Sequence, residues 1–241
     1  MHVLRLSTQV HKWIALVVGI QVLFWVLGCL VMTAIPITTL RSEHHVAERA
    51  LAPLPMGAVL PVQEAASRAG VSPVEAQLKA SPRGPVWVFK PLVGEPVSVS
   101  ATTGLPLAAL TVEQVRALAQ GAYKGDGRTV SATLLATAPK ETGKTGPLWR
   151  VDFDDAEKTT FYLAPDTAEV VSKRSNVWRF YDFFWRLHIM NLEDGSNFNH
   201  PLIIFTTIFA LSIVISGFIM LWIRLARDFK VMRTARASRA P

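Results

Sequence analysis

Two long apolar runs constrain this chain more than any other feature of its sequence. Neither residues 13–35 nor residues 201–223 include a charged side chain, and each run has 23 residues. A helix of that length spans about 34 Å, which is enough to cross a hydrocarbon core of roughly 30 Å. The sequence therefore predicts two transmembrane helices, at residues 13–35 and 201–223, with the lipid bilayer as a partner.

The position of the positive charge predicts how these helices are oriented. The formal net charge is +7, yet residues 36–200 contain 17 Lys and Arg against 17 Asp and Glu. By the positive-inside rule, residues 1–12 and the basic tail at 224–241 are cytoplasmic, and residues 36–200 lie on the other side. Anionic lipid headgroups account for the basic ends, so no nucleic-acid partner is expected. The basic residues are Arg5, Lys12, Arg224, Arg227, Lys230, Arg233, Arg236 and Arg239, offset by Asp228.

A cleaved signal sequence is the alternative for the first run. Residues 26–29 resemble a lipoprotein cleavage box that ends at Cys29, the only cysteine. The chain stays apolar after Cys29, however, and the run exceeds the 7 to 15 residues of an ordinary signal-peptide core. We therefore expect Cys29 to be a small apolar residue within a membrane span.

The segment between the runs is predicted to be an α+β domain at residues 36–177. Two similar halves, at about 54–108 and 109–172, each read as a helix followed by three strands. The first helix starts near Leu60 and ends at Gly70, and Thr111 and Gln114 form a capping box that opens the second, which ends at Gly121. Each helix is expected to lie on a small antiparallel sheet. The predicted strands are 74–79, 86–90, 97–100, 130–136, 148–153 and 160–163, with closing turns at 102–105 and 165–168.

An aromatic-rich segment leads from this domain to the second run. In a helix at residues 178–188, Arg179, Asp182 and Arg186 share one stripe, and aromatic side chains form a broad apolar flank. Aromatic side chains so placed favour the headgroup layer. Residues 178–200 are therefore predicted to be an interfacial helix and loop that set the depth of His188.

Short motifs at the membrane segments carry a family likeness. The chain contains His11-Lys12-Trp13 before the first run, Leu187-His188 before the second, and a late Ser-Gly…Leu-Trp at residues 216–222. In this order they resemble the PepSY-associated transmembrane proteins, and the domain between them resembles a PepSY domain. The larger members of that family have four spans, whereas this chain has two. It also has no Gly-rich dinucleotide-binding fingerprint.

The resemblance implies a function. Large members of the family are similar to haem-containing reductases that pass electrons across the bacterial inner membrane to ferric siderophores in the periplasm. A similar role implies haem b, with His188, His11 and His200 as candidate axial ligands of the haem iron. On the predicted topology His11 lies near the cytoplasmic face and the other two near the periplasmic face, as two stacked redox centres require.

Two helices cannot enclose a haem, but four can. The haem interpretation therefore requires a homodimer or a membrane partner with further spans. Ala15 and Gly19 in the first run, and Ser212 and Ser216 in the second, have the small-residue spacing that lets helix backbones approach each other.

Simpler roles stay open for each histidine. His11 beside Lys12 and Trp13 is also typical of an interfacial anchor. His188 is also typical of an interface residue hydrogen-bonded to a headgroup or to backbone, and His200 before Pro201 of a helix start. His44 and His45 adjoin Glu43 and Glu48 and suit either a metal site or a solvated linker. Gln21 suits an interhelical hydrogen bond. The acidic residues Asp152, Asp154, Asp155 and Glu157 suit a solvated hairpin tip or a cation site.

The alternative function is a haem-free periplasmic interaction or regulatory module that restrains a peptidase or senses the envelope. PepSY domains are also similar to inhibitory propeptides of some metalloproteases. The chain itself has no His-Glu-x-x-His and no Gly-x-Ser-x-Gly motif, which argues against peptidase activity.

Overall fold

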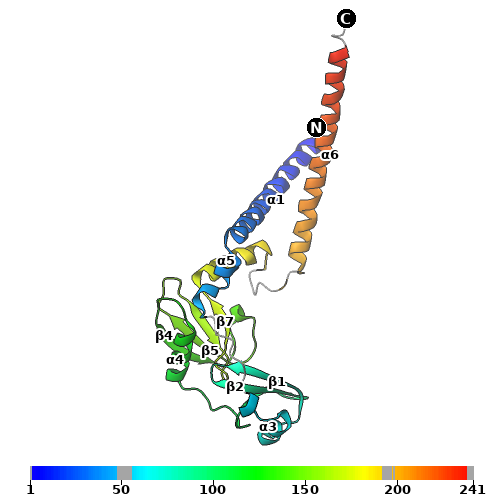
Figure 1. The fold of residues 1–241 in the computed structure, drawn as a ribbon. Helices are drawn as coiled ribbons and strands as arrows, with labels where there is room; N and C mark the ends of the chain where they lie inside the picture. Colours follow the sequence, from blue (N-terminus) through cyan, green and yellow to red (C-terminus); the bar gives the residue numbers. More distant parts are fainter. Residues whose placement is uncertain (1, 48–55, 192–196, 198, 238–241) are drawn as a thin grey trace. The chain divides into compact units, whose positions relative to one another are not determined.

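The computed structural model describes residues 2–47, 56–191, 197 and 199–237 (Figure 1). The chain forms two compact units. One contains residues 1–34 and 181–241, and the other contains residues 35–180.

Two long helices make up most of the first unit. Helix α1 covers His2–Ala34 and helix α6 covers Pro201–Ala237, and the two contact each other. The stretches long and apolar enough to span a membrane are Ala15–Ala34 and Pro201–Met232, and almost none of their described side chains is buried. Such exposure is unlike the core helix of a soluble domain and suits contact with lipid. The predicted pair of apolar helices is confirmed.

Helix α6 is longer than the predicted span. It continues from the apolar run through the basic tail to Ala237 without a break. Arg, Lys, Ala and Met are good helix formers, and no glycine or proline follows Gly217 before the helix ends. The charged residues that begin at Arg224 do not end the helix.

A helix and a three-stranded sheet form the first half of the second unit. Helix α3 covers Val62–Ala69, and strands β1 (Pro73–Ser81), β2 (Gly84–Pro91) and β3 (Val97–Ser100) form an antiparallel meander. Ala65 and Ala66 of the helix pack against Phe89 and Val99 of the sheet. Gly70 ends the helix at φ 67°, a left-handed backbone that glycine adopts at little cost.

The second half has a larger core and one more strand. Helix α4 covers Val112–Ala122, and strands β4 (Thr129–Leu135), β5 (Leu148–Phe153), β6 (Thr160–Leu163) and β7 (Val170–Arg174) form an antiparallel sheet in that order. The capping box at the start of α4 is present. The core of this half is Leu110, Val115, Ala119, Tyr123, Trp149, Val151, Phe153, Phe161, Leu163 and Ala168.

Each predicted helix and strand of this unit is present, so the α+β class is confirmed. Strand β7 is an addition that the sequence analysis missed. It follows the turn at residues 165–168, where Ala168 has a positive φ of 58°. The strand has only five residues, and the last two are Lys173 and Arg174. Its sequence alone gives a weak strand signal, and pairing with β6 supplies the rest.

Shorter elements connect these parts. They are α2 (Ile37–Leu40) and the 3₁₀ turns η1 (Glu43–His45), η2 (Met56–Ala58) and η3 (Lys140–Thr142). Helix α5 covers Asn176–His188, as the aromatic pattern predicts. Within α5, Arg186 Nε donates to Asp182 Oδ2 at 2.6 Å, which confirms their shared stripe. The Arg179 side chain is not only in contact with solvent, because its guanidinium donates a hydrogen bond to Thr160 Oγ1 at 3.1 Å.

Candidate functional site

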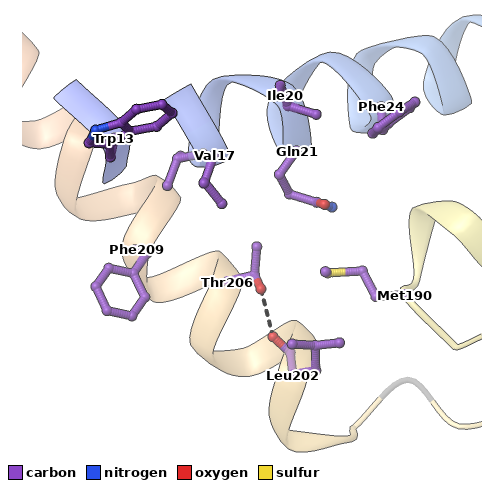
Figure 2. Close-up of a pocket in the computed structure, with 10 residues that line it drawn as sticks. Trp13, Val17, Ile20, Gln21, Phe24, Met190, Leu202, Thr206 and Phe209 are labelled. Atoms are coloured by element: carbon purple, nitrogen blue, oxygen red, sulfur yellow. Dashed lines mark hydrogen bonds between the residues drawn. The ribbon is translucent and has the colours of Figure 1, made fainter. Parts of the chain in front are cut away.

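An apolar cleft lies between the two candidate membrane helices. Its volume is about 690 Å³, within the range of about 300–1,000 Å³ typical of ligand and cofactor sites. Helix α1 provides one wall, helix α6 the other, and Met190 reaches in from the loop after α5 (Figure 2). The lining residues are Trp13, Val17, Val18, Ile20, Gln21, Phe24, Met190, Leu202, Thr206 and Phe209.

Few polar atoms face this cleft. Gln21 extends from α1 toward α6, and the thioether of Met190 points toward the same space (Figure 2). The Thr206 hydroxyl donates to the Leu202 carbonyl at 2.8 Å, so its hydrogen is satisfied within its own helix. The cleft therefore suits an apolar ligand that is held at one or two points.

His188, the last residue of α5, packs against helix α1 at Gly28. A Cβ atom on Gly28 would lie 3.4 Å from both Cβ and Nδ1 of His188, at the short end of ordinary van der Waals contact. The imidazole lies 6.2 Å from the Trp25 ring, with an angle of 47° between the planes. Sequence reasoning missed Gly28 and Trp25, since an apolar run gives no sign of which of its faces meets another helix.

The buried nitrogens at this contact lack partners. Within the part of the chain that the structure describes, neither His188 Nδ1 nor Trp25 Nε1 has a hydrogen-bond partner. A buried polar atom without a partner costs free energy. The contact between α5 and α1 therefore leaves two polar atoms unsatisfied among the described residues.

His200 stands at the start of α6 and is tied to the segment that carries His188. Its Nε2 lies 3.0 Å from the carbonyl oxygen of Met190, which accepts the hydrogen bond. One chain segment thus holds His188 and Met190, and His200 is bonded to it. Of these three residues, only Met190 lines the cleft, and His188 and His200 do not.

His11 lies far from Gly28 along helix α1. Seventeen positions separate it from Gly28, or about 26 Å along a helix. Its side chain lies outside the described residues. The structure therefore does not bring His11 together with His188 and His200, and the prediction of separate sites stays a prediction.

The donors near the cleft fit a haem. Haem iron is held in proteins by imidazole nitrogens or by a methionine thioether. The chain provides both kinds near an apolar cleft of adequate volume: His188 at the end of α5, Met190 in the loop after it, and His200 just before α6.

Asp152 makes structured contacts in the second unit instead of lying in a solvated tip. Asp152 accepts hydrogen bonds from Arg150 Nε at 3.0 Å, Thr160 Oγ1 at 2.8 Å and Ser131 Oγ at 2.9 Å. Burial alone would raise the pKa of the Asp152 carboxyl, but these three donors outweigh it and hold that pKa below its ordinary value. The solvated-tip interpretation is wrong for Asp152.

Glu141 joins the same polar region, which surrounds a hollow of about 410 Å³. Its carboxylate accepts a hydrogen bond from the Tyr162 hydroxyl and lies 3.6 Å from Arg179 Nε. Burial and the nearby Glu141 charge raise the pKa of Tyr162, so the phenol stays protonated and donates. These contacts fix the start of α5 to the sheet.

The solvated-linker interpretation is likewise wrong for His45, which is only 8% exposed. The neighbour proposed for this pair, Glu48, lies outside the described residues. Glu43 forms an ion pair with Arg41 at 3.8 Å. The carboxylates that approach the two histidines come from Asp155 and Glu157, far away in the sequence.

Comparison with known proteins identifies one family. The model of the PepSY-associated TM region matches residues 8–240, nearly the whole chain. No curated protein matches the sequence, and no solved structure matches it.

Proposed function

The chain belongs to the PepSY-associated TM family, and from this premise we propose that it binds haem b in the membrane and conducts electrons toward ferric iron in the periplasm. In this proposal the chain lies in a bacterial inner membrane. Both termini are cytoplasmic, because the excess of basic over acidic residues lies toward the N-terminal end of α1 and in the C-terminal part of α6. The domain between the spans is periplasmic, and the iron compound that receives the electrons is of the ferric-siderophore class.

The proposal rests on the apolar cleft and on three side chains of types that can bind iron, one of which lines the cleft while the other two are close to it in sequence or hydrogen-bonded to it. Met190 lines the cleft, His200 is bonded to the Met190 carbonyl, and His188 precedes Met190 by two residues. Apolar walls exclude water, and exclusion of water shifts the redox potential of a bound iron.

Each of these side chains has a separate task. His188 would hold the haem iron through an imidazole nitrogen, His200 would do so through Nδ1 because its Nε2 is bonded to the Met190 carbonyl, and Met190 would be the alternative donor through its thioether. The hydrogen bond between His200 Nε2 and the Met190 carbonyl fixes the direction of both residues. Haem, when bound, supplies the one-electron chemistry. His11 is the candidate donor for a second site toward the other end of α1.

A second copy of the chain is part of the proposal. Two helices leave most of their apolar side chains exposed, and four are needed to surround a haem. Gly19 has open space around it, with nothing among the described residues within 4 Å of a Cβ placed there, and Ala15 is exposed one turn away. This small-residue pair is the proposed contact between the α1 helices of a homodimer.

The experiment uses the full chain, overproduced in membranes with adequate haem and then purified in detergent. We expect a reduced b-type absorption spectrum. His188→Ala is expected to lower the haem content per chain at least about tenfold, by analogy with the effect of losing support at a metal site. His2→Ala, a histidine with no predicted role, is the matched control and is expected to keep the haem content.

Two results would count against the proposal. One is a wild-type protein without the b-type spectrum, which would favour the haem-free interaction module. The other is an unchanged spectrum and haem content in His188→Ala, which would remove His188 from the axial role.

A further inference from the structure

A segment that precedes the folded repeats is fastened to the second half of the domain. Residues His44 and His45 belong to the turn η1, and the backbone just after it pairs with the end of helix α4. Lys124 N donates to the His45 carbonyl and Ala47 N to the Ala122 carbonyl, both at 2.9 Å. These bonds flank an antiparallel bridge between Val46 and Tyr123. The position of the two histidines is therefore fixed by backbone contacts, independently of their own side chains.

The two imidazole rings lie together. Their centroids are 4.0 Å apart, and the other neighbour of the His45 ring is Tyr123, stacked at 5.6 Å with an angle of 16°. His45 is more than nine-tenths buried. Burial and the nearby Asp155 carboxylate raise the pKa of Tyr123 to about 12, so the phenol carries no charge at neutral pH.

Carboxylates from the hairpin between β5 and β6 complete the cluster. Glu157 Oε1 lies 3.4 Å from His44 Nε2, and Glu157 Oε2 lies 3.2 Å from His45 Nε2. Asp155 Oδ2 is 3.7 Å from the same His45 nitrogen. Although these distances are short, neither His45 Nε2 nor Glu157 Oε2 makes a hydrogen bond of acceptable direction among the described residues.

This arrangement is costly unless something joins the four groups. A buried imidazole nitrogen aimed at carboxylate oxygens, with no hydrogen bond formed, loses its hydration without replacement. One ligand atom from each of His44, His45 and Glu157 lies within 4.8 Å of the others. Ligand atoms around a tetrahedral Zn²⁺ ion are separated by about 3.4 Å, given bonds of about 2.1 Å. The cluster is therefore close to the size of a metal site.

Neighbouring contacts hold the hairpin in place. The Asp155 carboxylate accepts hydrogen bonds from Thr159 N at 2.7 Å and from Thr159 Oγ1 at 2.5 Å. The Glu157 carbonyl accepts a hydrogen bond from Asn176 N at 2.7 Å. Asp155 is thus held as a supporting carboxylate beside the cluster, in the manner in which second-layer carboxylates orient metal-bound histidines.

We propose that His44, His45 and Glu157 form a binding site for a divalent transition-metal ion of the Zn²⁺ type. Two imidazoles and a carboxylate suit such ions better than Mg²⁺ or Ca²⁺, which prefer oxygen ligands. His44 is partly exposed, so the ion has access from solvent and a position for water. The site belongs to the domain between the spans, and it is independent of the proposed haem.

The test uses the full chain in detergent, freed of metal by EDTA that is then removed. Zn²⁺ is added in a calorimetric titration, and Co²⁺ in a parallel titration followed by visible absorption, which reports coordination geometry. We expect one Zn²⁺ ion per chain and a Co²⁺ spectrum of four-coordinate intensity.

Variants at the more exposed ligands identify the site. His44→Ala and Glu157→Gln are each expected to weaken Zn²⁺ binding at least about tenfold and to abolish the Co²⁺ spectrum. His2→Ala and Glu75→Gln, a surface carboxylate on β1, are the matched controls and are expected to bind as the wild type does. Melting curves in EDTA check that each variant is folded, and a variant that fails this check is replaced by His44→Gln or Glu157→Ala.

Two outcomes would overturn the proposal. One is the absence of stoichiometric Zn²⁺ and Co²⁺ binding to the folded wild-type chain. The other is wild-type affinity in both ligand variants, which would assign the bound ion to another part of the chain, such as the histidines near α1 and α6. Haem content is measured in the same samples, because loss of the metal with haem retained separates the failure of this site from failure of the haem proposal.

Discussion

Individual residues in this chain are explained best by contacts that the sequence does not display. Asp152 belongs to an acidic stretch that suggests solvent exposure, yet three donors from three positions meet its carboxylate. Ser131 and Thr160 come from the neighbouring strands, in register with it. A cross-strand contact of this kind follows from sheet register, which sequence spacing defines poorly.

The depressed pKa of Asp152 makes the stability of the domain sensitive to acid. A carboxyl whose folded pKa lies below its unfolded value of about 3.9 stabilises the fold above that pH. This contribution is lost as the pH falls through the folded pKa. We therefore expect Asp152→Asn to lower the free energy of unfolding by about 1–3 kcal/mol at pH 7, with a smaller further loss between pH 5 and pH 2 than in the wild type.

The measurement is chemical unfolding of the full chain in detergent, followed by tryptophan fluorescence at several pH values. Glu75→Gln is the control, since that carboxylate is exposed on β1 beside Lys90. Equal acid sensitivity in Asp152→Asn and the wild type would contradict the assignment.

At the scale of elements, periodicity and capping predict what lies close in sequence. The helix that opens at Thr111 and the strand at residues 148–153 agree with the structure, because their signals are local. Strand β7 was missed because only its pairing with β6 makes it a strand. The approach of η1 to the β5–β6 hairpin was missed as well, since no local pattern links His45 with Glu157.

The packing of α5 on α1 leaves little room beside Gly28. A Cβ there is in ordinary contact distance of His188, at 3.4 Å, so Gly28→Ala is expected to be tolerated. Gly28→Val adds two methyl groups beyond that Cβ and is expected to displace His188, at a cost of about 1–3 kcal/mol.

Hydrogen–deuterium exchange of the backbone from Phe184 to Met190 measures this displacement. We expect faster exchange in Gly28→Val only. Gly217→Val is the matched control, because the described residues leave the space around Gly217 open. Protection in Gly28→Val equal to that of the wild type would mean that His188 does not rely on this contact.

At the scale of the whole molecule, the number of membrane helices limits what one chain can do. Helices α1 and α6 form one apolar cleft, but their other faces are exposed. In water such faces would drive aggregation, and in a bilayer they contact lipid or another helix. A homodimer would supply the two further helices that a haem site requires.

Gly19→Leu tests this assembly directly. The leucine would fill the space that lets two α1 helices approach through Ala15 and Gly19. We therefore expect the dissociation constant of the dimer to rise at least about tenfold. The oligomeric state is measured by counting photobleaching steps of single labelled chains in nanodiscs. Val214→Leu is the control, because it enlarges an exposed apolar residue outside the small-residue pairs.

If the proposed function is correct, Gly19→Leu also loses haem, since each monomer then lacks half of the enclosing helices. A variant that remains dimeric and retains its haem would place the contact between copies on another face, and a monomer that retains its haem would show that two helices suffice.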